Sequence, residues 1–169
     1  MKNLITLIAA VVLVAVAATA NAQVTGTATG SATIITPIAI ANAGNMNFGS
    51  IAVSTAPGTV VLSNAGVRAA SGGVTLPATT GTVSTANFTV TGLGSSTYSI
   101  TLPSSYVISD GASHSMTVNA FTSNPNGAGT LSAGGSQTIN VGATLNVLGS
   151  QTAGTYTNAT GFPVIVNYN

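Results

Sequence analysis

Few residues of this chain could do acid–base or nucleophilic chemistry, and they stand together between positions 110 and 115. Asp110 and His114, with Ser113 or Ser115, are the residue types of a nucleophilic triad. The chain has one acidic residue, one histidine and no cysteine, which excludes a paired-carboxylate hydrolase and a zinc site built from its own ligands. Asp110-Gly111 is also a typical turn signal before a strand. We therefore predict a turn here, with no catalytic residue, no metal and no cofactor.

The charge balance of the chain argues against several kinds of partner. Only 2% of the residues are charged, and Arg68 is the one cation that follows the N-terminal Lys2. A single arginine is not a basic patch, so we expect no nucleic-acid partner. A net charge close to zero removes the repulsion that keeps monomers apart, which favours a protein built into an assembly.

Residues 1–22 have the three parts of a secretory signal peptide. Lys2 is the charged start, an apolar stretch runs from Leu4 to Ala18, and Ala20-Asn21-Ala22 is a small-residue cleavage site. We expect cleavage before Gln23 and a secreted protein with no stable membrane insertion. The alternative, a membrane anchor, is less favoured because the apolar stretch is shorter than the roughly 20 residues of a spanning helix.

The segment that follows alternates between small apolar residues and hydroxyl residues. Its apolar row is Val24, Gly26, Ala28, Gly30, Ala32 and Ile34. Strand side chains point alternately to opposite faces, so this row can enter a groove while the hydroxyl row faces water. We predict that residues 23–36 are an extension that donates strand 24–34 to a neighbouring sheet; the alternative is a first strand folded into its own domain. Thr36-Pro37 is the expected hinge, because proline interrupts strand pairing.

The C-terminal residues form a second alternating segment. Its apolar row is Phe162, Val164, Val166 and Tyr168. A spare strand at one end of the chain and an unfinished sheet edge at the other favour a subunit that forms a homopolymer by lending strands to identical copies.

The rest of the chain has the pattern of short strands separated by Gly, Pro, Asn and Ser. The expected strands are Met46–Val53, Thr59–Leu62, Phe88–Thr91, Tyr98–Leu102, Met116–Phe121, Thr138–Val147 and Phe162–Tyr168. In the fifth of these, Met116, Val118 and Ala120 form the expected inward row. We predict an all-β fold over residues 37–169, an immunoglobulin-like antiparallel β-sandwich that is incomplete and is completed by the donated strand; a closed barrel is the alternative. Residues 64–86 are expected to form loops with one or two edge strands.

Three short motifs resemble the pilins of archaic chaperone-usher systems and the related spore-coat-U-like domains. They are Val24-Thr25-Gly26, Met46-Asn47-Phe48-Gly49, and Ala153-Gly154-Thr155-Tyr156 followed by Val164 to Asn169. The resemblance spans most of residues 23–169. It implies an incomplete sandwich that lacks its last strand and is capped by a periplasmic chaperone, and then by the N-terminal extension of the next subunit.

The same resemblance assigns roles to individual residues. Strand 24–34 becomes the donor, and the C-terminal strand with Phe162, Val164, Val166 and Tyr168 flanks the acceptor groove. Gly154 and Tyr168 are similar to the chaperone-recognition pattern of such pilins. The implied product is an extracellular pilus or fibre, exported through the periplasm and an outer-membrane usher, that supports adhesion or biofilm formation.

Two other classes of function stay open. One is a self-contained secreted β-sandwich that acts as a surface or carbohydrate-binding protein, for which Tyr106 is the expected exposed aromatic platform. The other is an enzyme, which the short inventory of acid–base residues makes the least favoured class.

Overall fold

The computed structural model describes residues 23–169, so the signal peptide predicted over residues 1–22 lies outside the described residues. The chain divides after Ile34 into an N-terminal part and a compact unit, Ile35–Asn169, close to the predicted boundary between residues 36 and 37. No strand is assigned within residues 23–34, where Val24 is 92% and Ile34 98% exposed. An extended segment becomes a strand only when it pairs, so the donated strand stays a prediction.

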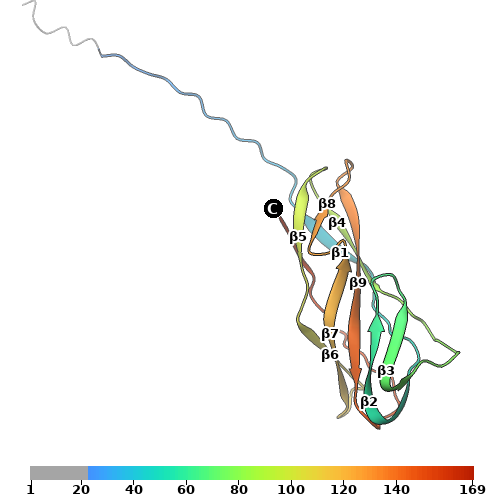
Figure 1. Ribbon diagram of the computed structural model, residues 1–169. Coiled ribbons are helices and arrows are strands. Elements are labelled where there is room, and N and C mark those ends of the chain that lie inside the picture. The colour runs from blue at the N-terminus through green and yellow to red at the C-terminus, as the bar shows by residue number, and fades with distance from the viewer. Residues whose placement is uncertain (1–22) are drawn as a thin grey trace, which may run out of the picture. The chain divides into compact units, whose positions relative to one another are not determined.

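The compact unit consists of ten β-strands (Figure 1). They are β1 Ala39–Gly44, β2 Ala52–Leu62, β3 Arg68–Thr75, β4 Ala86–Thr91, β5 Thr97–Thr101, β6 Ser105–Ser109, β7 Ser115–Asn124, β8 Ala128–Thr130, β9 Ser136–Val147 and β10 Ile165–Tyr168. Every pairing between them is antiparallel, in two sheets. The predicted all-β antiparallel sandwich is confirmed. Residues 23–169 contain no helix that is long and apolar enough to cross a membrane.

Strand β9 lies at the centre of the larger sheet and pairs with β4, β2 and β7. This seven-stranded sheet runs β1-β4-β9-β2-β3, and β7 also pairs with β9 and carries β6. The first half of β9, Ser136–Val141, pairs with β4, and the second half, Ala143–Val147, pairs with β2. Gly142 lies between the two halves, where a Cβ would collide with the carbonyl oxygen of Leu62. A glycine is therefore required where β2 and β4 meet along one long strand.

The smaller sheet, ordered β10-β5-β8, covers only part of the larger one. Figure 1 places β5 and β8 at one end of the domain and the β2–β3 hairpin at the other. The core is accordingly split into two clusters. One contains residues of both sheets: Ala86, Phe88, Val90, Tyr98, Ile100, Leu131, Ile139, Val141 and Val166. The other contains no residue of the smaller sheet: Phe48, Val60, Leu62, Val74, Val118, Ala143, Leu145 and Val147.

Several strand boundaries differ from the prediction. Strands β1, β6 and β8 were not predicted, whereas β3 is an edge strand within residues 64–86, as expected. The strand predicted over Met46–Val53 is wrong for its first part, in which only Asn47 forms an isolated bridge, because the chain bends at Gly49 with φ of 71°. The C-terminal strand begins at Ile165 rather than Phe162, since Pro163 has no N–H to donate.

The inward row predicted for β7 is wrong at its last member. The pairing of β7 with β9 shifts between Asn119 and Thr122, and Ala120 has φ of 49° and is exposed. This bulge inserts one residue into the alternation, so that Phe121 packs against both clusters in place of Ala120.

Candidate interaction cleft

A cleft of about 1220 Å³ opens between residues 42–53 and residues 151–162. Both segments lie largely outside the strands, and they form its two walls. The floor is apolar and comes from β4, β6, β7 and β9, with Phe88, Tyr106, Ile108, Met116, Val118, Leu145 and Val147 among its residues. Small-molecule pockets measure about 300–1,000 Å³, so this cleft has room for a peptide segment.

The second sheet does not reach this floor, and Val118, Leu145 and Val147 are nevertheless only 1–3% exposed. Val118, Leu145 and Val147 belong to the core cluster that has no residue of β5, β8 or β10. A sheet with one apolar face has to bury that face against another layer. Here the second sheet contributes no residue, Phe48 of the first segment packs in the cluster, and Met116 and Ile108 are left half-buried at the cleft. Apolar surface of this kind marks a place where a further element binds.

The first wall, residues 45–50, is held from the side away from the cleft. The backbone N–H and carbonyl of Asn47 bond those of Ser84 at 2.8 and 3.0 Å, and the Ser84 hydroxyl donates to the Asn45 carbonyl at 2.7 Å. The Ser50 N–H donates to the carbonyl of Thr80 at 2.7 Å. Residues 54–85 do not line the cleft, so these bonds leave the inner edge of the wall to whatever enters it.

The second wall, residues 151–162, is fastened in the same way to β6. The backbone groups of Thr157 and Ser109 exchange two hydrogen bonds of 2.8 and 2.9 Å. The Asn158 side chain donates to the Val107 carbonyl, and the Tyr106 hydroxyl donates to the Asn158 carbonyl, both at 2.8 Å. The wall is thus a loop, with a bend at 153–154 and a turn at 159–160, that is fixed to β6 by an isolated bridge without forming a strand.

Phe162 closes the end of the second wall. Its ring packs on Phe121 with centroids 4.9 Å apart, and edge to face on Tyr106 at 5.6 Å and Phe88 at 6.3 Å. The prediction of an exposed Tyr106 platform is wrong, because this side chain is half-buried in the aromatic group, and burial raises the pKa of its phenol. Three of these four rings, those of Phe88, Tyr106 and Phe162, line the cleft, and Phe121 packs on Phe162.

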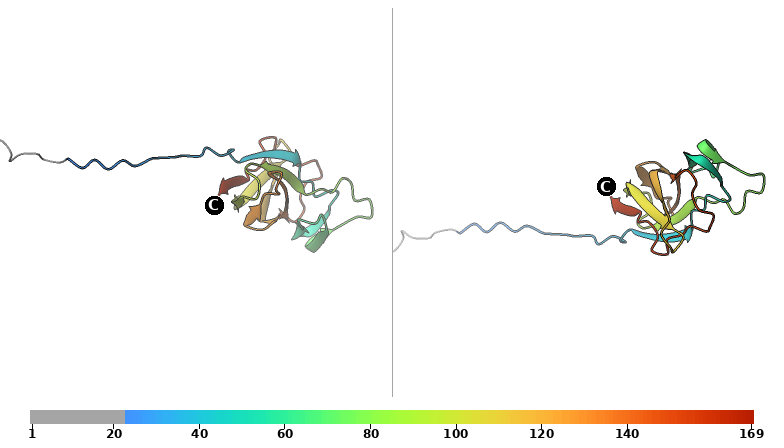
Figure 2. Two further views of the ribbon diagram at one scale, coloured as in Figure 1. Left: turned by 90° about the horizontal axis from the view of Figure 1, so that it is seen from above. Right: turned by 90° about the horizontal axis from the view of Figure 1, so that it is seen from below.

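Strands β1 and β10 each have one edge without a strand partner among the described residues. Strand β1 pairs only with β4 and β10 only with β5 among residues 23–169, although β1 and β10 approach each other. Figure 2 shows both strands on the same side of the domain, β1 in blue-green and β10 in red. Unpaired strand edges present rows of N–H and C=O groups that can pair with another strand.

The four residues predicted for the C-terminal strand do not all reach the cleft. Phe162 lines it, and so does Gly154. Val166 is 8% exposed in the cluster shared by the two sheets, and Val164 packs against that cluster. The Tyr168 hydroxyl donates to the Thr36 carbonyl at 2.8 Å and accepts from the Leu93 N–H at 2.6 Å, which ties β10 to the chain just before β1.

The predicted donor residues lie in the N-terminal part of the chain. Their backbone positions are exposed, and no atom lies within 4 Å of a Cβ added at Gly26 or Gly30. The walls were not predicted as walls: residues 46–53 were expected to form a strand, and Ala153-Gly154-Thr155-Tyr156 was a motif with no structure assigned to it. Only contacts between distant segments define them.

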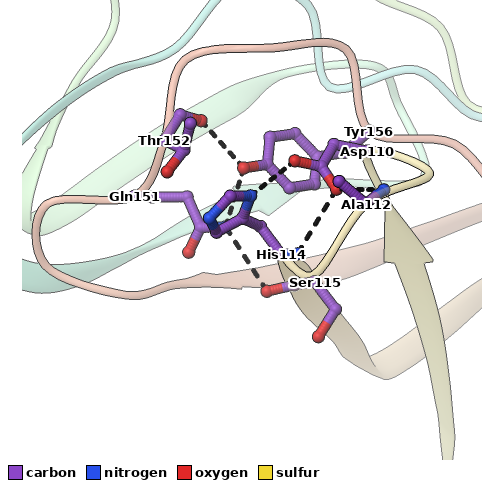
Figure 3. A network of polar contacts seen from close by, with 7 residues as sticks. All are labelled: Asp110, Ala112, His114, Ser115, Gln151, Thr152 and Tyr156. Atoms are coloured by element: carbon purple, nitrogen blue, oxygen red, sulfur yellow. Dashed lines mark hydrogen bonds and ion pairs between the residues drawn. The ribbon is translucent and has the colours of Figure 1, made fainter.

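Asp110 and His114 form the predicted turn at the outer side of the second wall (Figure 3). The His114 Nδ1 lies 2.6 Å from the Asp110 Oδ2, and Asp110 Oδ1 accepts the Ala112 N–H at 2.9 Å. The side-chain bond from His114 and the backbone bond from Ala112 lower the pKa of Asp110. Within residues 23–169, neither the Ser113 nor the Ser115 hydroxyl bonds the imidazole.

The turn is linked to the wall through Gln151. Its Nε2 donates to the Tyr156 hydroxyl at 3.0 Å and lies 3.4 Å from the Ser115 carbonyl, and the Tyr156 hydroxyl donates to the Thr152 carbonyl (Figure 3). These contacts are those of a fastened loop. The described residues contain no group of three or more metal-ligating side chains.

Comparison of the chain with curated proteins and with solved structures gave no match. A family model does match, over residues 38–168, which takes in both sheets and the whole cleft and begins after the N-terminal extension. The chain belongs to this family, described as a domain of unknown function, DUF4402.

Proposed function

We propose that this protein is a structural subunit of an extracellular pilus or fibre, in which each copy inserts strand 24–34 into the cleft of the next copy. The subunits then join head to tail by donor-strand exchange. A periplasmic chaperone covers the cleft before assembly and an outer-membrane usher exports the subunits, as in the pilins that the sequence resembles. The fibre supports adhesion or biofilm formation.

The observation that carries the proposal is the cleft of about 1220 Å³ with an apolar floor between two walls. Its walls are segments outside the named strands, and each is fixed by hydrogen bonds to a neighbouring part of the domain. A strand inserted between them gains main-chain hydrogen bonds and covers the floor with alternate side chains. The chain itself contains a segment with such alternation, in residues 24–34.

The energetics of insertion favour the ends of the donor row. Val24 and Ile34 are 92% and 98% exposed, and each contributes roughly 1.5–3 kcal/mol when fully buried. Ala28 and Ala32 contribute less. Gly26 and Gly30 of the same row allow close approach of the backbones. The main-chain ladder then supplies affinity, and the small size of the inward side chains supplies specificity.

The test compares the two faces of the donor strand in the full chain. Ala28→Asp and Ala32→Asp each place a carboxylate on the inward row, where burial without a partner is costly. Thr27→Asp and Thr29→Asp add the same charge on the outward row and are the matched controls. We expect unboiled surface protein to give a ladder of multimers on a denaturing gel for the controls and for the parent chain, and monomer for the inward variants.

Two results contradict the proposal. One is a single monomer band from the unboiled parent chain, which would favour the self-contained sandwich. The other is an equal loss of multimers in the inward and the outward variants, which would show that charge alone, and not the face of the strand, decides assembly.

A further inference from the structure

We propose that Arg68 is a positioning residue for the strand-accepting cleft: its guanidinium holds the first wall, residues 45–50, at the spacing that an incoming strand needs. This inference rests on the proposed function, because it concerns how the same cleft takes up a strand.

Two backbone carbonyls of the first wall accept hydrogen bonds from the same nitrogen of Arg68. Its Nη1 donates to the carbonyl of Phe48 at 2.6 Å and to the carbonyl of Ser50 at 3.0 Å. Both acceptors belong to residues that line the cleft, whereas Arg68 lies on β3 and does not line it. The arginine therefore reaches the wall from outside.

Gly49 brings the two carbonyls to the same cation. Its φ of 71° lies in the left-handed region, and a Cβ there would come 2.8 Å from Nη1 of Arg68 and would collide with the carbonyl oxygen of Thr80. A residue with a side chain at this position would displace the guanidinium. The bend and the arginine thus form one unit, which fixes the backbone on either side of Gly49.

The charge of Arg68 is satisfied by these carbonyls and not by an acid. Within the described residues the one ion pair joins His114 and Asp110, so the guanidinium has no carboxylate partner. Only 2% of the residues in the sequence are charged, and the single arginine donates hydrogen bonds to two carbonyls of the first wall. Hydrogen bonds from a charged donor are about twice as strong as neutral ones, which suits a clamp on a segment that belongs to no sheet.

The position of the wall decides how well a strand is accepted. Neighbouring strands have to lie about 4.8 Å apart for their hydrogen bonds to form, and these bonds weaken steeply with poor geometry. The Phe48 ring is buried in the cluster under the cleft, so a shift of its backbone also disturbs the floor. Without the clamp, the bonds to Ser84 and Thr80 still hold the wall, but the carbonyls of Phe48 and Ser50 are no longer fixed on either side of Gly49.

The experiment measures peptide capture by the full chain carrying Ala28→Asp, which prevents donation of its own arm. The probe is a fluorescent synthetic peptide of residues 23–35, and its dissociation constant is measured by anisotropy. We expect Arg68→Gln to weaken capture by about tenfold and Arg68→Lys, which keeps one cationic donor, by about threefold. Ile139→Val is the control, since Ile139 is buried in the other cluster and does not line the cleft; it lowers stability and leaves capture unchanged.

Each outcome decides one question. Equal dissociation constants for the parent chain and both arginine variants overturn the role of Arg68 and leave the proposed function standing. A parent chain that does not capture the peptide overturns the proposed function, and the role of Arg68 with it. If Arg68→Gln does not fold, Arg68→Lys decides alone: weaker capture at an unchanged midpoint of urea unfolding supports the clamp, and unchanged capture refutes it.

Discussion

At the scale of single residues, the few charged side chains hold the loops around the cleft. Arg68 bonds the first wall, and the turn closed by Asp110 and His114 lies beside the second. The sequence raised the pair as a possible triad and favoured a turn, and the structure places it in a turn. The chemistry of these groups is used for hydrogen bonding, with carbonyls and backbone N–H groups as partners.

The Asp110 carboxylate predicts a pH-dependent stability. Its pKa is lowered from the ordinary value of 3.8, chiefly by the bond from His114. A carboxyl whose folded-state pKa is depressed stabilises the fold above its unfolded pKa, and the contribution is lost as the pH falls through the folded value. In the Ala28→Asp chain, we expect Asp110→Asn to lower the midpoint of urea unfolding at pH 7 and to have no effect in acid well below pH 3.8.

Ser113→Ala is the control for this turn, because the Ser113 hydroxyl makes no hydrogen bond within residues 23–169. Its midpoint should follow that of the parent chain at every pH. A penalty for Asp110→Asn that is the same at pH 7 and in acid would mean that packing of the turn, and not the charge, is what the substitution disturbs.

At the scale of elements, β9 organises the domain. Among the described strands it is the one that pairs with three others. Its inward row is divided between the two core clusters, with Ile139 and Val141 in one and Ala143, Leu145 and Val147 in the other. The alternation of this row is readable in the sequence. The point at Gly142 where pairing changes from β4 to β2 is not, because a glycine inside a strand pattern has the same appearance whatever lies against it.

Gly142→Ala should therefore be strongly destabilising. The added methyl group meets backbone atoms of Leu62 and Ser63, which cannot move without breaking the pairing of β2. We expect a loss of roughly 1–3 kcal/mol in the free energy of unfolding, measured by urea denaturation of the Ala28→Asp chain.

Gly134→Ala is the matched substitution, since the nearest atom to its added Cβ is the Ser132 hydroxyl at 3.8 Å. Its effect should stay within about 0.5 kcal/mol, as for other surface changes. Similar losses for the two alanines would contradict the collision at Gly142 as the cause, because Gly→Ala acts on the unfolded chain in the stabilising direction.

At the scale of the whole molecule, the proposed subunit has two different binding surfaces. The arm at residues 24–34 and the cleft are not alike, so contacts between copies are heterologous and can extend without closing. A domain with half-buried apolar side chains at a cleft and almost no charge is at risk of nonspecific association. Occupation of the cleft by a strand removes that risk.

Deletion of residues 24–34 separates the two surfaces. The shortened chain keeps the cleft but has nothing to donate, so it should join one end of a growing fibre and stop it there. We expect an equimolar mixture with the intact chain to give markedly shorter ladders on unboiled denaturing gels than the intact chain alone. A shortened chain that forms its own ladder would show that assembly does not use the arm.

The sequence by itself determined the class of fold and the residues that face inward. Alternation over β4, β5 and β9 predicts which side chains are buried, because in a strand the side-chain direction has a period of two whatever the strand pairs with. The charge inventory and the turn at Asp110 are local properties in the same sense. The extension before Ile35 also follows from the sequence pattern, and its role as a donor stays a prediction.

Only the tertiary structure decided where the sheet is left uncovered. The walls at residues 45–50 and 151–162 have no periodicity of their own, and they are positioned by partners such as Ser84, Thr80 and Arg68 that are distant in sequence. The bulge at Ala120 and the short β10 likewise depend on which strand lies opposite. A cleft is a relation between segments that fold together, and long-range contacts of this kind leave no local pattern in the chain.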